Sequence, residues 1–200
     1  MSRFDDAAKR WDLNPRRVET ARAVCGKILK IVDVRGFDIL DYGCGTGLVS
    51  FGLFEYAKSI TAMDNSKGMI KELNKKAAVL KIDNIKTVLH DIEKEKLPKN
   101  SFDMIVSSMT LHHIKKPEMF FQKAKTALKD GGYLAISDLF EEDGSFHSHG
   151  NEGVHHFGFS KKRMKKLYQD NGFEILFLDT VYTVKKAKEY KLFLAMGKAT

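Results

Sequence analysis

Cysteine, proline and long apolar runs are all scarce in this sequence of 200 residues. The two cysteines, Cys25 and Cys44, cannot build a disulfide framework, so we expect a reducing compartment, the cytoplasm. No uninterrupted apolar run approaches the roughly 18 residues that a membrane-spanning helix needs. The first ten residues also lack the apolar core of a signal peptide. These absences favour a cytoplasmic protein with no membrane partner.

The composition favours one folded domain that carries an excess of positive charge. Hydrophobic residues make up 43% of the chain and charged residues 30%, which argues against wholesale disorder. The length suits a single domain over residues 1–200. Lys and Arg number 34 against 26 Asp and Glu, a net charge of +8, so an anionic partner such as RNA is one hypothesis.

Short apolar runs alternate with stretches of helical periodicity along the chain. This alternation predicts an α/β protein with a mostly parallel sheet covered on both faces. Residues 140–159, which are rich in Gly, His and acidic residues, break the rhythm and are predicted to form a long functional or mobile loop. The predicted strands are residues 37–42, 59–64, 85–90, 102–107, 133–137, 173–178 and 190–195, and the predicted helices are residues 16–32, 48–56, 67–80, 118–129 and 160–171.

A glycine-rich turn follows the first predicted strand. The strand ends near Asp41 and continues into Gly43-Cys44-Gly45-Thr46-Gly47. Glycines at a strand-to-helix turn let the backbone approach a ligand closely. The spacing matches neither the dinucleotide pattern G-x-G-x-x-G nor the phosphate loop G-x-x-x-x-G-K-[ST]. A purely structural tight turn is the alternative interpretation.

Carboxylates recur at the ends of three successive predicted strands. Asp41 is followed by Asp64 at the end of the second strand and by Asp91 just after the third. The carboxyl ends of parallel strands meet at one edge of the sheet, where ligands bind. A carboxylate there can accept hydrogen bonds from both hydroxyls of a ribose. The pattern favours a ligand with hydroxyls, amines or a cationic centre over one with phosphates.

A set of motifs occurs in a fixed order along the chain, in residues 39–47, 63–66 with Met69, 90–92, 97–107, 111–113 and 128–134. This ordered set resembles the class I S-adenosylmethionine-dependent methyltransferases, in particular the methyltransferase type 11 or UbiE-like group. The resemblance implies a three-layer Rossmann-like fold with a seven-stranded mixed sheet whose last strand is antiparallel. It also implies an enzyme that uses S-adenosyl-L-methionine, with residues 1–34 as an N-terminal helical cap and residues 140–159 as an acceptor-side loop.

The same resemblance implies roles for individual residues. Asp64 is expected to hold the ribose, Asp91 and Ile92 to contact adenine, and Gly43 and Gly45 to face the methionine part. Ser107 would line the cofactor's path, and Trp11 would lie near the sulfonium as a cation–π partner or, alternatively, anchor the first helix in the core. The whole expected cofactor site is Trp11, Asp41, Gly43, Cys44, Gly45, Asp64, Asn65, Met69, Asp91, Ile92 and Ser107.

The methyl acceptor is predicted to be a small molecule. Residues 107–110 lack the Asn/Asp-Pro-Pro-Tyr/Phe motif that amino-methylating nucleic-acid enzymes of this fold usually carry. Both cysteines are in the first helix and the glycine turn, which disfavours a nucleophilic cysteine. The alternatives are a tRNA or rRNA methyltransferase, motivated by the +8 charge, and a non-catalytic cofactor-binding module that regulates a partner. Clustered lysines on the predicted helix 160–171 are typical of a solvated face.

Histidines gather in the predicted loop at His147, His149, His155 and His156. Converging histidines could hold a metal, His156 could act in the acceptor site as a base or orienting group, or the loop could simply be solvated. We expect no metal, take His156 as the first candidate catalytic residue, and take His112 as the second.

Overall fold

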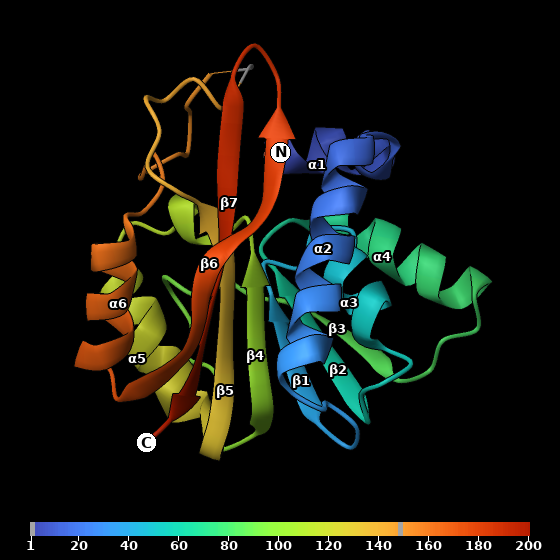
Figure 1. Cartoon of the computed structure of the whole chain (residues 1–200). Coiled ribbons are helices and arrows are strands. Elements are labelled where there is room, and N and C mark those ends of the chain that lie inside the picture. The colour runs from blue at the N-terminus through green and yellow to red at the C-terminus, as the bar shows by residue number, and fades with distance from the viewer. Residues whose placement is uncertain (1–2, 148–149) are drawn as a thin grey trace.

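Seven strands form one mixed sheet between two layers of helices (Figure 1). The computed structural model describes residues 3–147 and 150–200, so His149 lies outside the described residues. The strand order is β3-β2-β1-β4-β5-β7-β6; β1 to β5 pair in parallel, and β7 is antiparallel to both of its neighbours. This confirms the predicted fold. The strands are β1 Asp38–Tyr42, β2 Ser59–Asp64, β3 Ile85–Leu89, β4 Phe102–Ser108, β5 Leu128–Leu139, β6 Phe173–Lys185 and β7 Glu189–Ala199.

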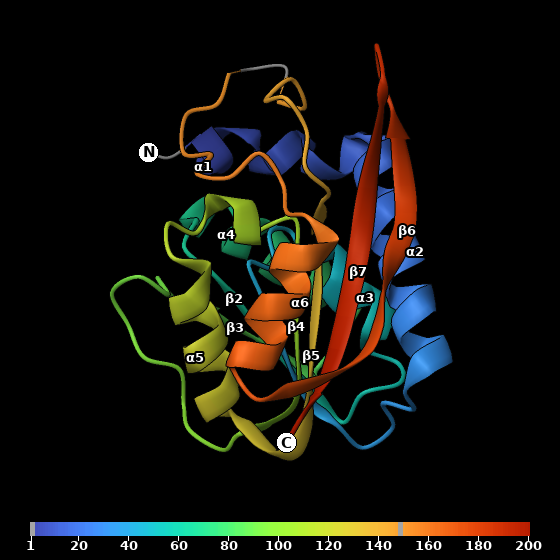
Figure 2. The ribbon, with the colours of Figure 1, turned by 60° about the vertical axis from the view of Figure 1, so that its left-hand side comes forward.

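Helices cover both faces of the sheet (Figures 1 and 2). On one face α2 (Pro15–Ile31), α3 (Leu48–Leu53) and α4 (Lys67–Val79) bury their apolar stripes against alternate residues of the strands. On the other face α5 (Pro117–Ala127) and α6 (Lys161–Asp170) do the same. Parallel strands are therefore buried on both sides, as their continuous apolar sequences require.

The predicted helix boundaries have capping interactions. The side chain of Asn14 accepts a hydrogen bond at the start of α2, and Pro15 occupies the first turn. Ser66 and Ser160 cap α4 and α6 in the same way. Gly172 follows α6 with a φ of +71°, the left-handed conformation that commonly ends a helix.

The last two strands are longer than predicted. Residues 173–178 are only the beginning of β6, which continues to Lys185, and residues 190–195 lie within β7, which runs from Glu189 to Ala199; the two strands form a hairpin paired as far as Lys185 and Glu189. Lysines near the turn interrupt the alternation of apolar and polar residues that indicates a strand. Pairing between the two strands nevertheless stabilises the extended backbone there. The fifth strand also starts earlier, at Leu128, because its first residues pair with β4 before a register shift.

Several segments that are distant in the sequence lie together at one end of the sheet. The segments found there are the short helix α1 (Arg3–Ala7), the 3₁₀ helix η1 (Ala8–Leu13), residues 140–147 and 150–159, and the β6–β7 hairpin (Figure 2). This is the end at which the parallel strands finish. Among the described residues, no helix combines the length and apolar character needed to cross a membrane.

Tyr168 joins α6 to the sheet. Its ring is fully buried, and its hydroxyl donates to the carbonyls of Leu134, at 3.2 Å, and Ala195, at 2.8 Å. Gly197 of β7 lies directly beneath the ring, where an added Cβ would be 2.6 Å from the ring's Cδ1 atom. Gly197 therefore allows α6 to pack closely on the sheet.

We expect Gly197→Ala to lower the free energy of unfolding by about 1–3 kcal/mol, because the added methyl group overpacks this contact. As a matched control, Gly26→Ala in the middle of α2, where nothing lies within 4 Å of an added Cβ, should raise it by about 0.5–1 kcal/mol. Urea unfolding of both variants measures the two effects. Equal stabilities of the Gly197 variant and the parent would contradict the described packing.

Candidate active site

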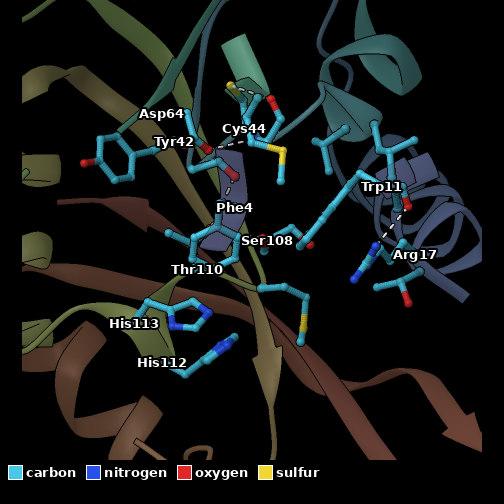
Figure 3. A pocket seen from close by; sticks show the side chains of 18 of the residues that line it. Phe4, Trp11, Arg17, Tyr42, Cys44, Asp64, Ser108, Thr110, His112 and His113 are labelled. Atoms are coloured by element: carbon cyan, nitrogen blue, oxygen red, sulfur yellow. Dashed lines mark hydrogen bonds between the residues drawn. The ribbon is translucent and has the colours of Figure 1, made fainter. Parts of the chain in front are cut away.

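A cavity of about 450 Å³ opens where the parallel strands end. Its walls come from the turn after β1, the ends of β2 and β4, the segment after β3, and the 3₁₀ helix η2 (Leu111–His113). The N-terminal segment, Phe146 and His147 of the loop after β5, and the β6–β7 hairpin complete it. Figure 3 shows side chains from several of these elements pointing into the same space. The cavity is therefore assembled from nearly the whole length of the chain.

Glycines shape the turn between β1 and α3. Gly43, Gly45 and Gly47 have φ values of +70°, +54° and +88°, which L side chains rarely adopt. An added Cβ at Gly43 would lie 2.1 Å from Oγ1 of Thr110, and one at Gly47 would lie 2.8 Å from Leu73. The turn is thus structurally constrained and also forms a wall of the cavity.

Asp64 fixes this turn against the end of β2. One carboxylate oxygen accepts from the backbone N–H of Gly45 and the other from that of Ser66, both at 2.8 Å. Burial raises the pKa of Asp64, although these hydrogen bonds favour its ionised form. Each oxygen has a second lone pair, so the carboxylate can still accept hydrogen bonds from a ligand in the cavity.

The other two predicted carboxylates differ in environment. Asp41 is 1% exposed and accepts from the Ser50 hydroxyl at 2.6 Å, and its burial raises the pKa to about 7. Asp91 is half-buried, and its hydrogen bond from Lys94 lowers the pKa of Asp91. All three carboxylates line the cavity as predicted. The pKa values of Asp41 and Asp64 are raised, whereas that of Asp91 is lowered.

Trp11 lines the cavity from η1. The guanidinium of Arg17 stacks on the indole at 3.5 Å from the ring centroid, and Arg17 also donates to the Trp11 carbonyl at 3.1 Å. The ring of Phe4 meets the indole edge-on at 5.9 Å between centroids. Trp11 therefore packs the N-terminal segment against α2 and forms part of the cavity wall as well.

Two aspartates attach the N-terminal segment to the rest of the domain. Asp5 accepts from the hydroxyl of Ser66 at 2.6 Å, at the start of α4. Asp12 accepts from Thr46 in the glycine turn and pairs with Lys76 of α4, both at 2.5 Å. These contacts hold α1 and η1 over the cavity.

Asp138 and His112 form a buried pair on the opposite side of the cavity. The imidazole Nδ1 is 2.7 Å from one Asp138 oxygen, and the His112 backbone N–H donates to the other at 3.1 Å. Burial opposes ionisation of Asp138, but the adjacent imidazole of His112 and the hydrogen bonds from that ring and from the backbone N–H groups of His112 and Leu139 outweigh it and lower the pKa of Asp138. Nδ1 therefore carries the proton, and Nε2, which is buried without a partner among the described residues, has a free lone pair.

His113 and His147 extend this pair into a cluster. The ring centroids of His112 and His113 are 4.0 Å apart, and those of His112 and His147 are 5.1 Å apart. His113 Nδ1 is 2.7 Å from the Gly153 carbonyl. Burial lowers the pKa of His113 to about 3 and that of His147 to about 4, so both are neutral near pH 7. In Figure 3 the His112 and His113 rings lie below Phe4 and Thr110.

Two of the predicted site residues do not line the cavity. Ser107 is buried, and its neighbour Ser108 lines the cavity instead, because successive strand residues point to opposite faces. His156 is half-buried, with Nε2 3.0 Å from the Ile114 carbonyl and Nδ1 3.5 Å from Arg163. The other predicted residues line it: Trp11, Asp41, Gly43, Cys44, Gly45, Asp64, Asn65, Met69, Asp91, Ile92 and His112.

Asp138 and His147 are not among the site residues predicted from the sequence. An acidic residue near the end of an otherwise apolar strand was the available signal for Asp138. His147 was noticed as part of the histidine-rich loop, but spacing alone could not distinguish it from His156. Val184 and Lys186 were missed because the hairpin that carries them is longer than predicted.

Comparison with known proteins identifies the domain. A family model described as a methyltransferase domain matches residues 33–172. An uncharacterized methyltransferase of Schizosaccharomyces pombe is 34% identical over 149 residues, which cover 68% of this chain and 52% of the relative. A ubiquinone biosynthesis O-methyltransferase of Coxiella burnetii is 27% identical over 143 residues, covering 70% of this chain and 61% of the relative.

The fold matches solved structures of the same type. The crystal structure of an S-adenosylmethionine-dependent methyltransferase from Mesorhizobium loti superposes with a TM-score of 0.71 at 19% identity, covering 88% of this chain and 97% of that one. The chain spans about half to three-fifths of the length of the two curated relatives. Together these matches confirm the resemblance stated from the motifs, and with it S-adenosylmethionine as the cofactor of this type of domain.

Asp41 makes stability depend on pH in a direction unusual for a carboxylate. Its pKa of about 7 in the folded state exceeds the value of about 3.9 in an unfolded chain. The folded state therefore retains a proton that the unfolded chain releases, and this stabilisation is lost as pH rises towards 7. Relative to Asp41→Asn, the parent should lose about 2–3 kcal/mol of unfolding free energy between pH 5 and pH 8.

Urea unfolding across this pH range measures the difference, with Asp83→Asn on the exposed turn before β3 as the control. That control should run parallel to the parent. A constant difference between Asp41→Asn and the parent would mean that Asp41 is ionised in the folded protein throughout.

Proposed function

We propose that this chain, which belongs to the methyltransferase domain family, transfers a methyl group from S-adenosylmethionine to an ionisable oxygen or sulfur atom of a small molecule. One observation carries the proposal. A single cavity joins a glycine-walled, acidic half at the strand ends to a half lined by His112, His113 and His147. The first half suits the cofactor, and the second half suits an acceptor that must lose a proton.

The residues of the first half fit the cofactor. Side chains at Gly43 and Gly45 would be unfavourable in this left-handed backbone, so the turn presents bare backbone to the cavity. Asp64 retains acceptor capacity for ribose hydroxyls, and Asp91 with Ile92 borders the place expected for adenine. S-adenosylmethionine supplies an electrophilic methyl group on a positively charged sulfur. The chain holds it with these residues and with Trp11, Asn65 and Met69, while Ser108 takes the place expected of Ser107.

The second half can place an acceptor. Met109, Val184 and Leu192 give it apolar walls beside the histidines. Displacement at a methyl group requires the acceptor atom in line with the sulfur, so alignment and exclusion of water are the chain's main contributions. A cavity of about 450 Å³ bordered by the N-terminal segment, Phe146, His147 and the hairpin suits a small molecule better than a polynucleotide.

His112 is the residue proposed to contact the reacting atom of the acceptor. Asp138 fixes its ring and tautomer, so the Nε2 lone pair is available to the proton of an acceptor hydroxyl or thiol. His156, the first candidate from sequence, is not proposed for this role because it does not line the cavity. The similarity to a ubiquinone biosynthesis O-methyltransferase supports an oxygen acceptor.

The cytoplasm is the proposed location. Cys25 and Cys44 are free and buried, as expected of a protein that folds in a reducing compartment.

Binding of S-adenosylhomocysteine tests the cofactor half. We expect Asp64→Ala to weaken binding by about 10–100-fold, because hydrogen bonds to a charged group contribute about 1.5–3 kcal/mol. Asp83→Ala removes an exposed carboxylate outside the cavity and should bind like the parent. Isothermal titration calorimetry measures all three affinities. If Asp64→Ala binds as tightly as the parent, the assignment of this half is wrong.

Transfer of a labelled methyl group tests the acceptor half. With S-adenosylmethionine and pools of small phenols and thiols, label should enter the small-molecule fraction, and His112→Asn should lower kcat/KM by about 100-fold. S-adenosylhomocysteine affinity should stay near that of the parent. Label in total RNA, with tight binding at physiological salt, would favour the RNA methyltransferase alternative instead. Retained cofactor binding with no methylated product would favour a regulatory module.

A further inference from the structure

Three histidines converge at the acceptor end of the cavity. His112 and His113 come from η2, and His147 comes from the loop after β5. Each offers a nitrogen, and these three nitrogens lie within 4.8 Å of one another. His112 Nε2 and His147 Nδ1 are buried without a hydrogen-bond partner among the described residues. Buried polar nitrogens without partners are rare, and two of them within one group of three histidines point to a ligand.

The surroundings of these rings match those of metal-binding histidines. Such histidines almost always donate the second ring N–H to a carboxylate or a backbone carbonyl, which fixes the tautomer. His112 donates to Asp138 at 2.7 Å, and His113 donates to the Gly153 carbonyl at 2.7 Å. Both rings are thereby left with Nε2 as the free ligand atom.

We propose that His112, His113 and His147 bind a divalent first-row transition ion, zinc being the best match, with Asp138 and Gly153 as supporting residues. Imidazole nitrogens suit Zn²⁺, and three protein ligands with one open position are typical of sites that act on a bound molecule. This departs from our expectation from sequence that no metal is bound. Zinc–nitrogen bonds of about 2.0–2.1 Å require the most widely spaced pair of these nitrogens to approach by up to about 1.5 Å. Because His112 and His113 share η2, His147 is the ligand that would move.

The open position faces the cavity, which all three histidines line. The reacting oxygen or sulfur of the acceptor would lose its proton to solvent and bind the ion as the fourth ligand, in place of a direct hydrogen bond to His112. This role of the ion rests on the function proposed above, whereas its binding does not.

Cobalt and zinc ions alone test the site. The full chain, prepared without a histidine tag and stripped with a chelator, should bind one equivalent of Co²⁺ with the visible absorption of a four-coordinate ion, and Zn²⁺ should displace it. His113→Ala and His147→Ala should each weaken binding by at least about 10-fold, and Asp138→Asn should weaken it by about 10–100-fold. His155→Ala, an exposed histidine of the same loop outside the cavity, should bind like the parent.

Circular dichroism and S-adenosylhomocysteine affinity verify that each variant is folded. Absence of stoichiometric Co²⁺ binding by the folded parent would overturn the proposal, as would equal affinities of the parent, His113→Ala and His147→Ala. These readouts involve no methyl transfer, so a protein that binds the ion but methylates nothing would refute the proposed function and leave the metal site standing.

Discussion

The hydrogen bond from the Gly45 N–H to Asp64 is the constraint on which the cofactor end of this domain depends. It ties the turn after β1 to the end of β2, and the second oxygen of the same carboxylate fixes the start of α4 through Ser66. Asp5 then joins the N-terminal segment to the same serine. A short chain of polar contacts thus positions the turn, the helix and the segment that closes over the cavity. Because these contacts are partly buried, the loss of any one of them costs more free energy than the loss of an exposed hydrogen bond.

The acceptor end depends on a second buried polar pair. A charged Asp138 inside the sheet would be expensive without partners, and His112 together with two backbone N–H groups supplies them. Such a pair adds little net stability, but it holds the ring of His112 in one orientation and one tautomer. The two ends of the cavity therefore use carboxylates differently. Asp64 fixes the backbone N–H groups of Gly45 and Ser66, whereas Asp138 fixes the imidazole ring of His112.

Most of the sheet could be predicted from the sequence, because apolar runs, helix caps and glycine stops are local signals. The cofactor half could also be predicted, since parallel strands deliver their ends to one edge and the motif residues lie at those ends. Ser107 was misplaced because a one-residue shift along a strand reverses the direction of a side chain.

The sequence by itself determined the fold class, the turn at Gly43–Gly47 and the edge at which the carboxylates gather. These follow from local backbone preferences and from the geometry shared by all parallel sheets. Only the tertiary structure decided which histidines belong to the site. His112 and Asp138 are 26 residues apart and meet because β4 and β5 are neighbours, and His147 joins them through a loop whose path no local pattern encodes. Contacts between distant segments depend on packing of the whole domain, so spacing in the sequence could not distinguish His147 from His156.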